Sequence, residues 1–302
     1  MSGLEILNVL SGILGAALIL LCLDDVFHNL FHPAGQGRLS GFAMRGTWRL
    51  SRRLRRWPSP MTGPVGIIAV IAMWVLLQVI GWALVYLPQV PAGFAYSTGV
   101  DPSHYPPFFE SVYLSLVALT TLGFGDVVPT HPALRILAPL EALTGFVLFT
   151  ACVSWIMQLY PALNRRRTAA LTLGNLIRAG FLARLRHGEE RDADAIVLTE
   201  LAGTLAQARA DLTQNGETYY FVDADRSTGL APAMASAWRL ASAAERAQNP
   251  SVRSAGAALA GATANLTQLL EAEYLSTDHV GTVALIAACS RDRREPTVLR
   301  SD

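Results

Sequence analysis

The chain has 302 residues, of which 52% are hydrophobic and 16% are charged, so it is more apolar than an ordinary soluble domain. Its formal net charge of +1 gives no reason to expect a nucleic-acid partner. Its three cysteines lack the paired spacing that is typical of disulfides or zinc sites. These properties favour a membrane protein.

Three apolar runs are long enough to cross a bilayer, since a membrane helix needs about 20 predominantly apolar residues. They extend from Ile6 to Leu23, from Val65 to Leu87 and from Ile136 to Tyr160. The alternative for the first run is a cleaved signal peptide. A signal peptide carries its positive charges before the apolar stretch, whereas here they follow it, so we expect a membrane helix.

Arginines flank these runs on sides that predict their orientation. Seven lie between the first and second runs: Arg38, Arg45, Arg49, Arg52, Arg53, Arg55 and Arg56. Three more, Arg165 to Arg167, follow the third run. Because arginine-rich flanks stay in the cytoplasm, we expect a multi-pass protein of the plasma or inner membrane with its N-terminus outside and its C-terminus in the cytoplasm.

Three polar residues lie at the end of the first run. Asp24, His28 and His32 are spaced four apart and would share one face of a helix. Two histidines and a carboxylate can bind zinc or respond to pH. The alternative is that they are only the polar end of the helix beside Pro33.

The linker between the first two runs, residues 33–63, has arginines at helical spacing. The four that share a face are Arg45, Arg49, Arg52 and Arg56. This pattern is typical of a helix that lies among anionic lipid headgroups. An irregular loop that serves only as a topology signal is the alternative, because glycines and prolines interrupt the linker.

A shorter apolar stretch, Phe108 to Leu119, follows the second run. As a helix it would be about 18 Å long, so it can enter the membrane but cannot leave on the far side. Thr120, Thr121, Leu122, Gly123, Phe124, Gly125 and Asp126 come directly after it. Irregular backbone is tolerated at membrane depth only where protein encloses it or it lines a water-filled path, so we expect a re-entrant loop.

The residue types in this string suit the dehydration of an ion. Stacked backbone carbonyls can replace the water shell of a potassium ion. Glycines at alternate positions allow the dihedral angles that turn successive carbonyls the same way. We expect potassium to be coordinated by Thr121, Leu122, Gly123 and Phe124, and no other cofactor.

Thr120 to Asp126 resembles the signature of potassium channels, with Leu122 and Phe124 where valine and tyrosine are commonest. The carbonyl mechanism is that family's own. The resemblance covers a two-helix pore unit, about Val65 to Tyr160, and leaves out the first run and the C-terminal region. Since such single-pore chains assemble in fours around one axis, it implies a C4 homotetramer.

The third run contains the residues that the resemblance assigns to the gate. Gly145 matches the family's hinge glycine in the pore-lining helix. Phe149 and Val153 lie four and eight residues further on, so they would share the face below the hinge that lines the cavity.

Glu141 is the acidic residue within the third run, and a charge at the centre of a bilayer is costly without a partner. Two interpretations are open. Glu141 either accepts a hydrogen bond from Ser115 or Thr120 behind the filter, or it faces a water-filled cavity.

From Asn164 onward the composition is alanine-rich and charged, which predicts a cytoplasmic helical domain. The expected organisation is a first transmembrane helix (1–32), an arginine-rich linker (33–63), a potassium-channel pore domain (64–163) and this helical domain (164–302). The fold class is an all-α membrane protein with three transmembrane helices, a re-entrant pore helix and a filter.

Passive potassium conduction is the predicted function, with an unidentified gating stimulus and no enzyme activity. One alternative is the conducting subunit of a potassium uptake transporter, although relatives of that kind carry four degenerate pore units in a single chain. Another is a membrane sensor that acts through protein partners of the helical domain. Arginines spaced through a transmembrane helix, which voltage sensing requires, are absent from the three runs.

Orientation can be tested with single cysteines placed at Ser2 and Ser301. The arginine flanks predict that a membrane-impermeant thiol reagent labels the first position in intact cells and leaves the second unlabelled. Permeabilised cells, in which both positions should react, are the control. Labelling at Ser301 from outside would reverse the predicted direction of the filter.

Overall fold

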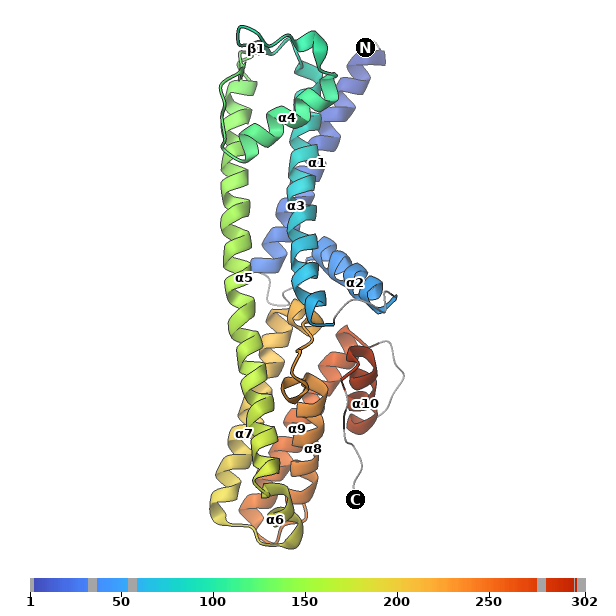
Figure 1. Cartoon of the computed structure of the whole chain (residues 1–302), viewed down its shortest axis with the longest axis vertical. Coiled ribbons are helices and arrows are strands. Elements are labelled where there is room, and N and C mark those ends of the chain that lie inside the picture. Colours follow the sequence, from blue (N-terminus) through green and yellow to red (C-terminus); the bar gives the residue numbers. More distant parts are fainter. Residues whose placement is uncertain (1–2, 32–36, 54–58, 276–280, 296, 298–302) are drawn as a thin grey trace. The chain divides into compact units, whose positions relative to one another are not determined.

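The computed structural model describes residues 3–31, 37–53, 59–275, 281–295 and 297 (Figure 1). It is predominantly helical. Two compact units are present: the membrane unit comprises Met1–Thr47 and Val65–Met157, and the C-terminal unit comprises Trp48–Pro64 and Gln158–Asp302.

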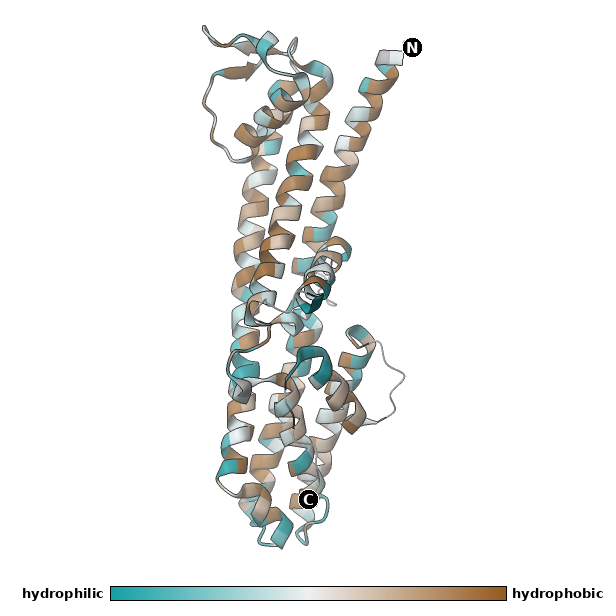
Figure 2. Cartoon of the chain, turned by 45° about the vertical axis from the view of Figure 1, so that its right-hand side comes forward, coloured by the Kyte–Doolittle hydropathy of each residue, from teal (hydrophilic) through white to brown (hydrophobic). Residues whose placement is uncertain are grey.

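Three helices in the described part of the chain are long and apolar enough to cross a membrane. They are α1 (Gly3–Phe31), α3 (Thr62–Tyr86) and α5 (Leu134–Arg178). Hydrophobic residues predominate along α1 and α3 (Figure 2). The three predicted spans are therefore confirmed. Helix α5 continues without a break past the predicted domain boundary at residue 163.

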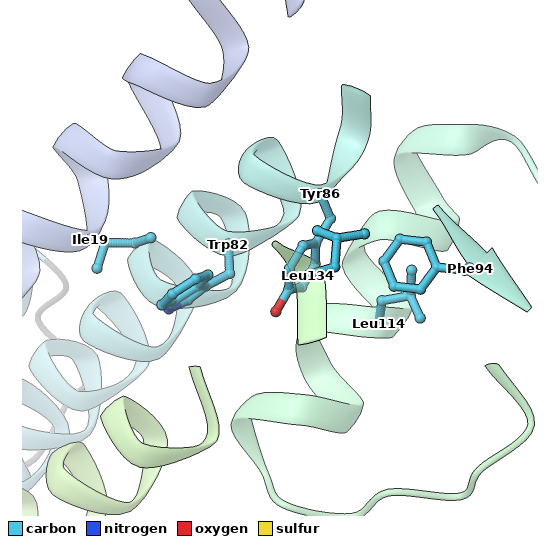
Figure 3. Close-up of a cluster of buried hydrophobic side chains, with 6 residues drawn as sticks. All are labelled: Ile19, Trp82, Tyr86, Phe94, Leu114 and Leu134. Atoms are coloured by element: carbon cyan, nitrogen blue, oxygen red, sulfur yellow. The ribbon is translucent and has the colours of Figure 1, made fainter. Parts of the chain in front are cut away.

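Helices α1 and α3 pack closely because glycine lies where they approach each other. A Cβ on Gly15 would lie 2.4 Å from the carbonyl oxygen of Gly81. One turn earlier in α1, the hydroxyl of Ser11 donates to the carbonyl of Leu84 over 2.7 Å. The side chain of Ile19 extends this contact into a buried cluster with Trp82 (Figure 3).

A small β-ribbon departs from the all-helical expectation. Strands β1 (Phe94–Tyr96) and β2 (Val127–Pro129) pair antiparallel, with Tyr96 opposite Val127. The ribbon joins the segment before helix α4 (Pro107–Leu119) to the segment after the predicted filter string, residues 120–126. Phe94 of β1 packs with Leu114 of α4 and Leu134 of α5 in the cluster shown in Figure 3. Sequence periodicity missed it because each strand has only three residues.

The arginine-rich linker contains a helix, α2 (Arg38–Arg53), and is not an irregular loop over these residues; its place among headgroups stays a prediction. Helix α2 is continuous through its glycines, of which Gly41 is buried. Met44 is buried too, and a Cβ on Gly66 of α3 would lie 2.6 Å from the Met44 sulfur. Arg56, predicted on the same face as Arg45, lies outside the described residues.

The C-terminal unit is a helical bundle. Besides the end of α5, its helices are α6 (Phe181–His187), α7 (Asp192–Gln214), α8 (Leu230–Ala244), α9 (Pro250–Glu273) and α10 (Thr282–Arg293). Short 3₁₀ turns occur in the chain at Ser59–Met61, Leu87–Gln89, Pro102–His104, Gly216–Tyr220 and Arg226–Thr228. Leu198, Leu201 and Leu205 are spaced three and four residues apart, so they share one face of α7, and all three are buried.

Two buried arginines hold the segment 216–223 by its backbone. Arg166 of α5 donates to the carbonyl of Phe221 over 2.8 Å and to the carboxylate of Asp223 over 3.2 Å. Arg293 of α10 donates to the same Phe221 carbonyl over 2.9 Å. Both guanidinium groups are almost fully buried, and Arg293 also forms an ion pair with the buried carboxylate of Glu295 over 2.8 Å.

The aromatic side chains of this segment pack within the same unit. The rings of Tyr219 and Tyr274 stack with centroids 4.2 Å apart. Trp48, near the end of α2, lies 5.6 Å from the ring of Tyr220. A Cβ on Gly63 would lie 2.5 Å from the ring of Phe221, so glycine is needed there by close approach. Segment 216–223 thus joins the ends of α2, α3 and α5 inside the C-terminal unit.

The stability of this arrangement can be measured through Cys289, whose side chain is fully buried. Burial raises the pKa of its thiol to about 12, so alkylation reports opening of the bundle. Arg293→Met leaves buried acceptors unpaired and should cost the unit roughly 3 kcal/mol. We expect alkylation of Cys289 in the full chain to accelerate at least tenfold. Arg246→Met, at an exposed arginine, is the matched control and should leave the rate unchanged.

Candidate functional site

The candidate filter begins where α4 ends. The hydroxyl of Thr120 donates to the carbonyl of Leu116 over 2.7 Å and closes the last turn of the helix. The amide of Thr121 then bonds to Ala118, and that of Leu122 to Val117, each over 3.0 Å. The amides of Thr121 and Leu122 are therefore hydrogen-bonded to carbonyls of α4, and the chain runs away from α4 after them.

The backbone of the string alternates in handedness. Thr121, Gly123 and Gly125 have φ of 57°, 57° and 76°, whereas Leu122 and Phe124 between them do not adopt positive φ. Residues other than glycine rarely adopt this left-handed backbone region, which glycine enters without penalty. A Cβ on either glycine would meet nothing within 4 Å, so the dihedral angle, and not lack of space, requires glycine there.

Hydrogen bonds hold the outer end of the string. The hydroxyl of Tyr113 in α4 donates to the carboxylate of Asp126 over 2.5 Å. The amide of Ser97, just after β1, donates to the carbonyl of Asp126 over 2.8 Å. The Ser97 hydroxyl also reaches the carbonyl of Gly125 over 3.3 Å. Pore helix and ribbon thus fix the residue that follows the last filter glycine.

Glu141 lies behind the pore helix and is fully buried. The hydroxyl of Ser115 donates to one oxygen of its carboxyl group over 2.6 Å, and the hydroxyl of Tyr86 donates to the other. The predicted partnership with Ser115 is confirmed, and the cavity-facing alternative is wrong because α3 and α4 cover the side chain. One carboxyl group connects α3, α4 and α5.

A cavity of about 440 Å³ lies beside the inner end of the string. Its lining brings together four of the predicted residues: Thr120, Thr121, Gly145 and Phe149. The side chain of Phe149 is 68% exposed in the single chain. Val153 is also exposed but lies outside this lining.

Gly145 has a packing role that its predicted hinge role did not anticipate. A Cβ at this position would lie 2.0 Å from the carbonyl oxygen of Leu119, the last residue of α4. Any side chain there would push α5 away from the base of the filter. The hinge stays a prediction, and Gly145→Ala cannot test it alone because the substitution would also displace Leu119.

The predicted polar trio at the end of α1 is incompletely described. His28 and Asp24 are neighbours, with Nδ1 of His28 3.4 Å from the Asp24 carboxylate. His32 lies outside the described residues. Within the part that the structure describes, no three histidine, cysteine or acidic side chains are grouped as metal ligands.

Sequence reasoning missed Tyr86, Tyr113 and Asp25. Tyr86 and Tyr113 are distant from their partners along the chain, so spacing carried no signal. Spacing did give a signal for Asp25, because Asp25 lies three residues after Cys22 and shares the buried face of α1 with it. We singled out its neighbour Asp24 instead, which is exposed.

Comparison with known proteins identifies the region that carries this site. Residues 69–160 match the family model described as "Ion channel". The uncharacterized membrane protein YdjJ of Bacillus subtilis (strain 168) is 24% identical over 173 residues, which are 54% of this chain and 50% of that protein. Two pore potassium channel c of Oryza sativa subsp. japonica is 29% identical over 96 residues, 30% of this chain and 20% of that protein.

The chain therefore spans half the length of the first relative and a fifth of the second. No solved structure matches it. The matched region contains the whole string from Thr120 to Asp126 and Glu141, and it covers most of the second predicted span and all of the third. Residues 69–160 are therefore similar to ion channels, and the resemblance of this multi-pass membrane protein to potassium channels is confirmed.

Proposed function

We propose that this protein is a potassium-selective channel that conducts passively through a pore formed by four copies of the chain. The observation that carries the proposal is the alternating left-handed backbone at Thr121, Gly123 and Gly125, at the end of a helix of half-membrane length. Alternation of this kind turns successive carbonyls toward one side. A column of carbonyl oxygens can then take the place of an ion's hydration shell.

The homotetramer is proposed because one chain cannot surround an ion. Residues 120–125 are exposed in the single chain, so their carbonyls are free to face other copies. Large apolar side chains of α5 are exposed as well: Leu143, Phe146, Val147, Phe149, Val153 and Met157. Four copies around one axis would cover part of this apolar surface and complete the ring of carbonyls.

For the gate we propose the exposed face of α5 below the filter. Phe149 would form an apolar constriction that excludes water when the four helices are close together. Bending near Gly145 would separate the four phenylalanines. The N-out, C-in orientation places the filter toward the outside, as the arginine flanks favour.

Selectivity can be tested by reconstituting the purified protein into liposomes and measuring uptake of rubidium and sodium. We expect rubidium and potassium to permeate at least tenfold faster than sodium. Gly123→Ala should abolish the flux, because it places a Cβ on a left-handed residue of the filter backbone.

The matched control is Gly174→Ala, at a helical glycine of α5 where a Cβ would meet nothing within 4 Å. It should conduct like the parent. Both variants should elute at the size of the parent assembly. Equal permeability to sodium and potassium in the parent protein would rule out a potassium filter.

The carboxyl group of Glu141 is proposed to support the filter from behind. Glu141→Ala leaves the hydroxyls of Ser115 and Tyr86 unpaired in a buried place, which costs about 1–3 kcal/mol for each group. We expect single-channel recordings of Glu141→Ala to show openings at least fivefold shorter, whereas Glu141→Gln, which retains an acceptor oxygen, should lie closer to the parent. Identical open times in all three proteins would remove Glu141 from the filter mechanism.

A further inference from the structure

Helix α2 presents an exposed arginine stripe with an apolar strip beside it. Arg38, Arg45 and Arg49 are exposed at spacings of seven and four, which places them on one side of the helix. Phe42 is 68% exposed and Leu50 is 51% exposed, next to this stripe. The helix contains no acidic residue that would neutralise the arginines.

The opposite side of α2 is already occupied. Ser40 and Met44 are buried, and Met44 packs over Gly66 of α3. The exposed arginines and Phe42 therefore cannot turn inward without breaking this packing. They are therefore presented outward, and a partner that covers this face would have to accept both guanidinium groups and an aromatic ring.

An anionic lipid surface meets both requirements. Its phosphate groups accept hydrogen bonds from arginine, and its acyl region takes up Phe42. A dissolved anion would leave the apolar strip in water. Along the chain, α2 lies between the first span, α1, and the second span, α3. Arg52 does not belong to this surface as predicted, because it pairs with Asp292 in the C-terminal unit over 2.6 Å.

A buried carboxylate connects α2 to the other helices of the membrane unit. Asp25 of α1, which is 2% exposed, accepts hydrogen bonds from the amides of Leu39 and Ser40 over 2.7 and 3.0 Å. It also accepts one from the indole Nε1 of Trp74 over 2.8 Å. A negative charge at a helix N-terminus is favourable, so Asp25 fixes the start of α2 against α3.

The contact continues to the helix that is proposed to line the pore. The ring of Trp74 packs against Trp155 of α5, with centroids 5.2 Å apart and planes 48° apart. Both rings are buried. A displacement of α2 would move Asp25 or break its hydrogen bonds, and either change would alter the position of Trp74 against Trp155.

We infer that α2 binds anionic lipid headgroups through Arg38, Phe42 and Arg45, and that Asp25, Trp74 and Trp155 transmit the position of α2 to α5. Anionic lipid thereby regulates the conformation of α5. Only the resulting change in ion flux rests on the proposed channel function.

Binding is tested with the full-length protein by native mass spectrometry during titration with phosphatidylglycerol or phosphatidylcholine. Each arginine beside an anionic surface contributes about fivefold, so Arg38→Gln with Arg45→Gln should weaken retention of phosphatidylglycerol by roughly 25-fold. Arg209→Gln with Arg246→Gln, at exposed arginines of the C-terminal unit, is the charge-matched control and should bind like the parent. Equal retention of the two lipids by the parent, or displacement of phosphatidylglycerol by equimolar inorganic phosphate, would overturn the lipid surface.

Transmission is tested with Trp74→Phe, which keeps a ring against Trp155 and removes the hydrogen bond to Asp25. Its control is Trp82→Phe, which removes the indole bond to Gln78 on the same helix. In liposomes with increasing phosphatidylglycerol, the alkylation rate of Cys152 in α5, resolved by peptide mass spectrometry, should change at least threefold in the parent and in Trp82→Phe. It should stay constant in Trp74→Phe.

A lipid-dependent rate in Trp74→Phe equal to that of the parent, or no dependence in the parent, would overturn the transmission. Rubidium flux is measured in the same liposomes and should follow the alkylation rate. If Cys152 responds to lipid while the parent carries no flux, the proposed channel function fails and the inference about α2 stands.

Discussion

The membrane unit depends on the hydrogen bonds around the Glu141 carboxyl group. Helix α4 has 13 residues, too few to cross a bilayer, and the chain leaves the α-helical conformation after Leu119. Ser115 and Tyr86 share the Glu141 carboxyl group directly behind this point. Because one side chain holds α3, α4 and α5 together, the irregular string after α4 rests on a rigid support.

Close packing adds a second constraint at the same place. The carbonyl of Leu119 lies where a side chain at position 145 would be, so α5 can reach the end of the pore helix only with glycine there. The lining of the adjacent cavity includes Thr121 and Phe149 as well as Gly145. The proposed gate and the inner end of the proposed filter are therefore neighbours, and a movement of α5 in this region would change the position of both.

Buried charges organise the backbone in both units. In the membrane unit, Asp25 accepts from amides at the start of α2 and from Trp74. In the C-terminal unit, Arg166 and Arg293 donate to the carbonyl of Phe221. Each charge is desolvated, and removing its partners leaves the charge uncompensated, so these contacts define one geometry. Arg166 belongs to the continuation of α5, which makes the C-terminal unit a direct partner of that helix.

The three spans, the half-length helix, the helical C-terminal region and the resemblance to potassium channels could all be predicted from the sequence, because apolar length and local residue type are properties of consecutive residues. It also named Ser115, with Thr120, as a candidate partner of Glu141, because a charge in a membrane span needs a partner. Packing of the helices reveals that Asp25, and not Asp24, joins α1 to α2 and α3, that Tyr86 completes the Glu141 network, and that the position of Leu119 requires glycine at residue 145. These contacts join residues up to 55 positions apart, and no local pattern encodes which distant side chains meet once the helices pack.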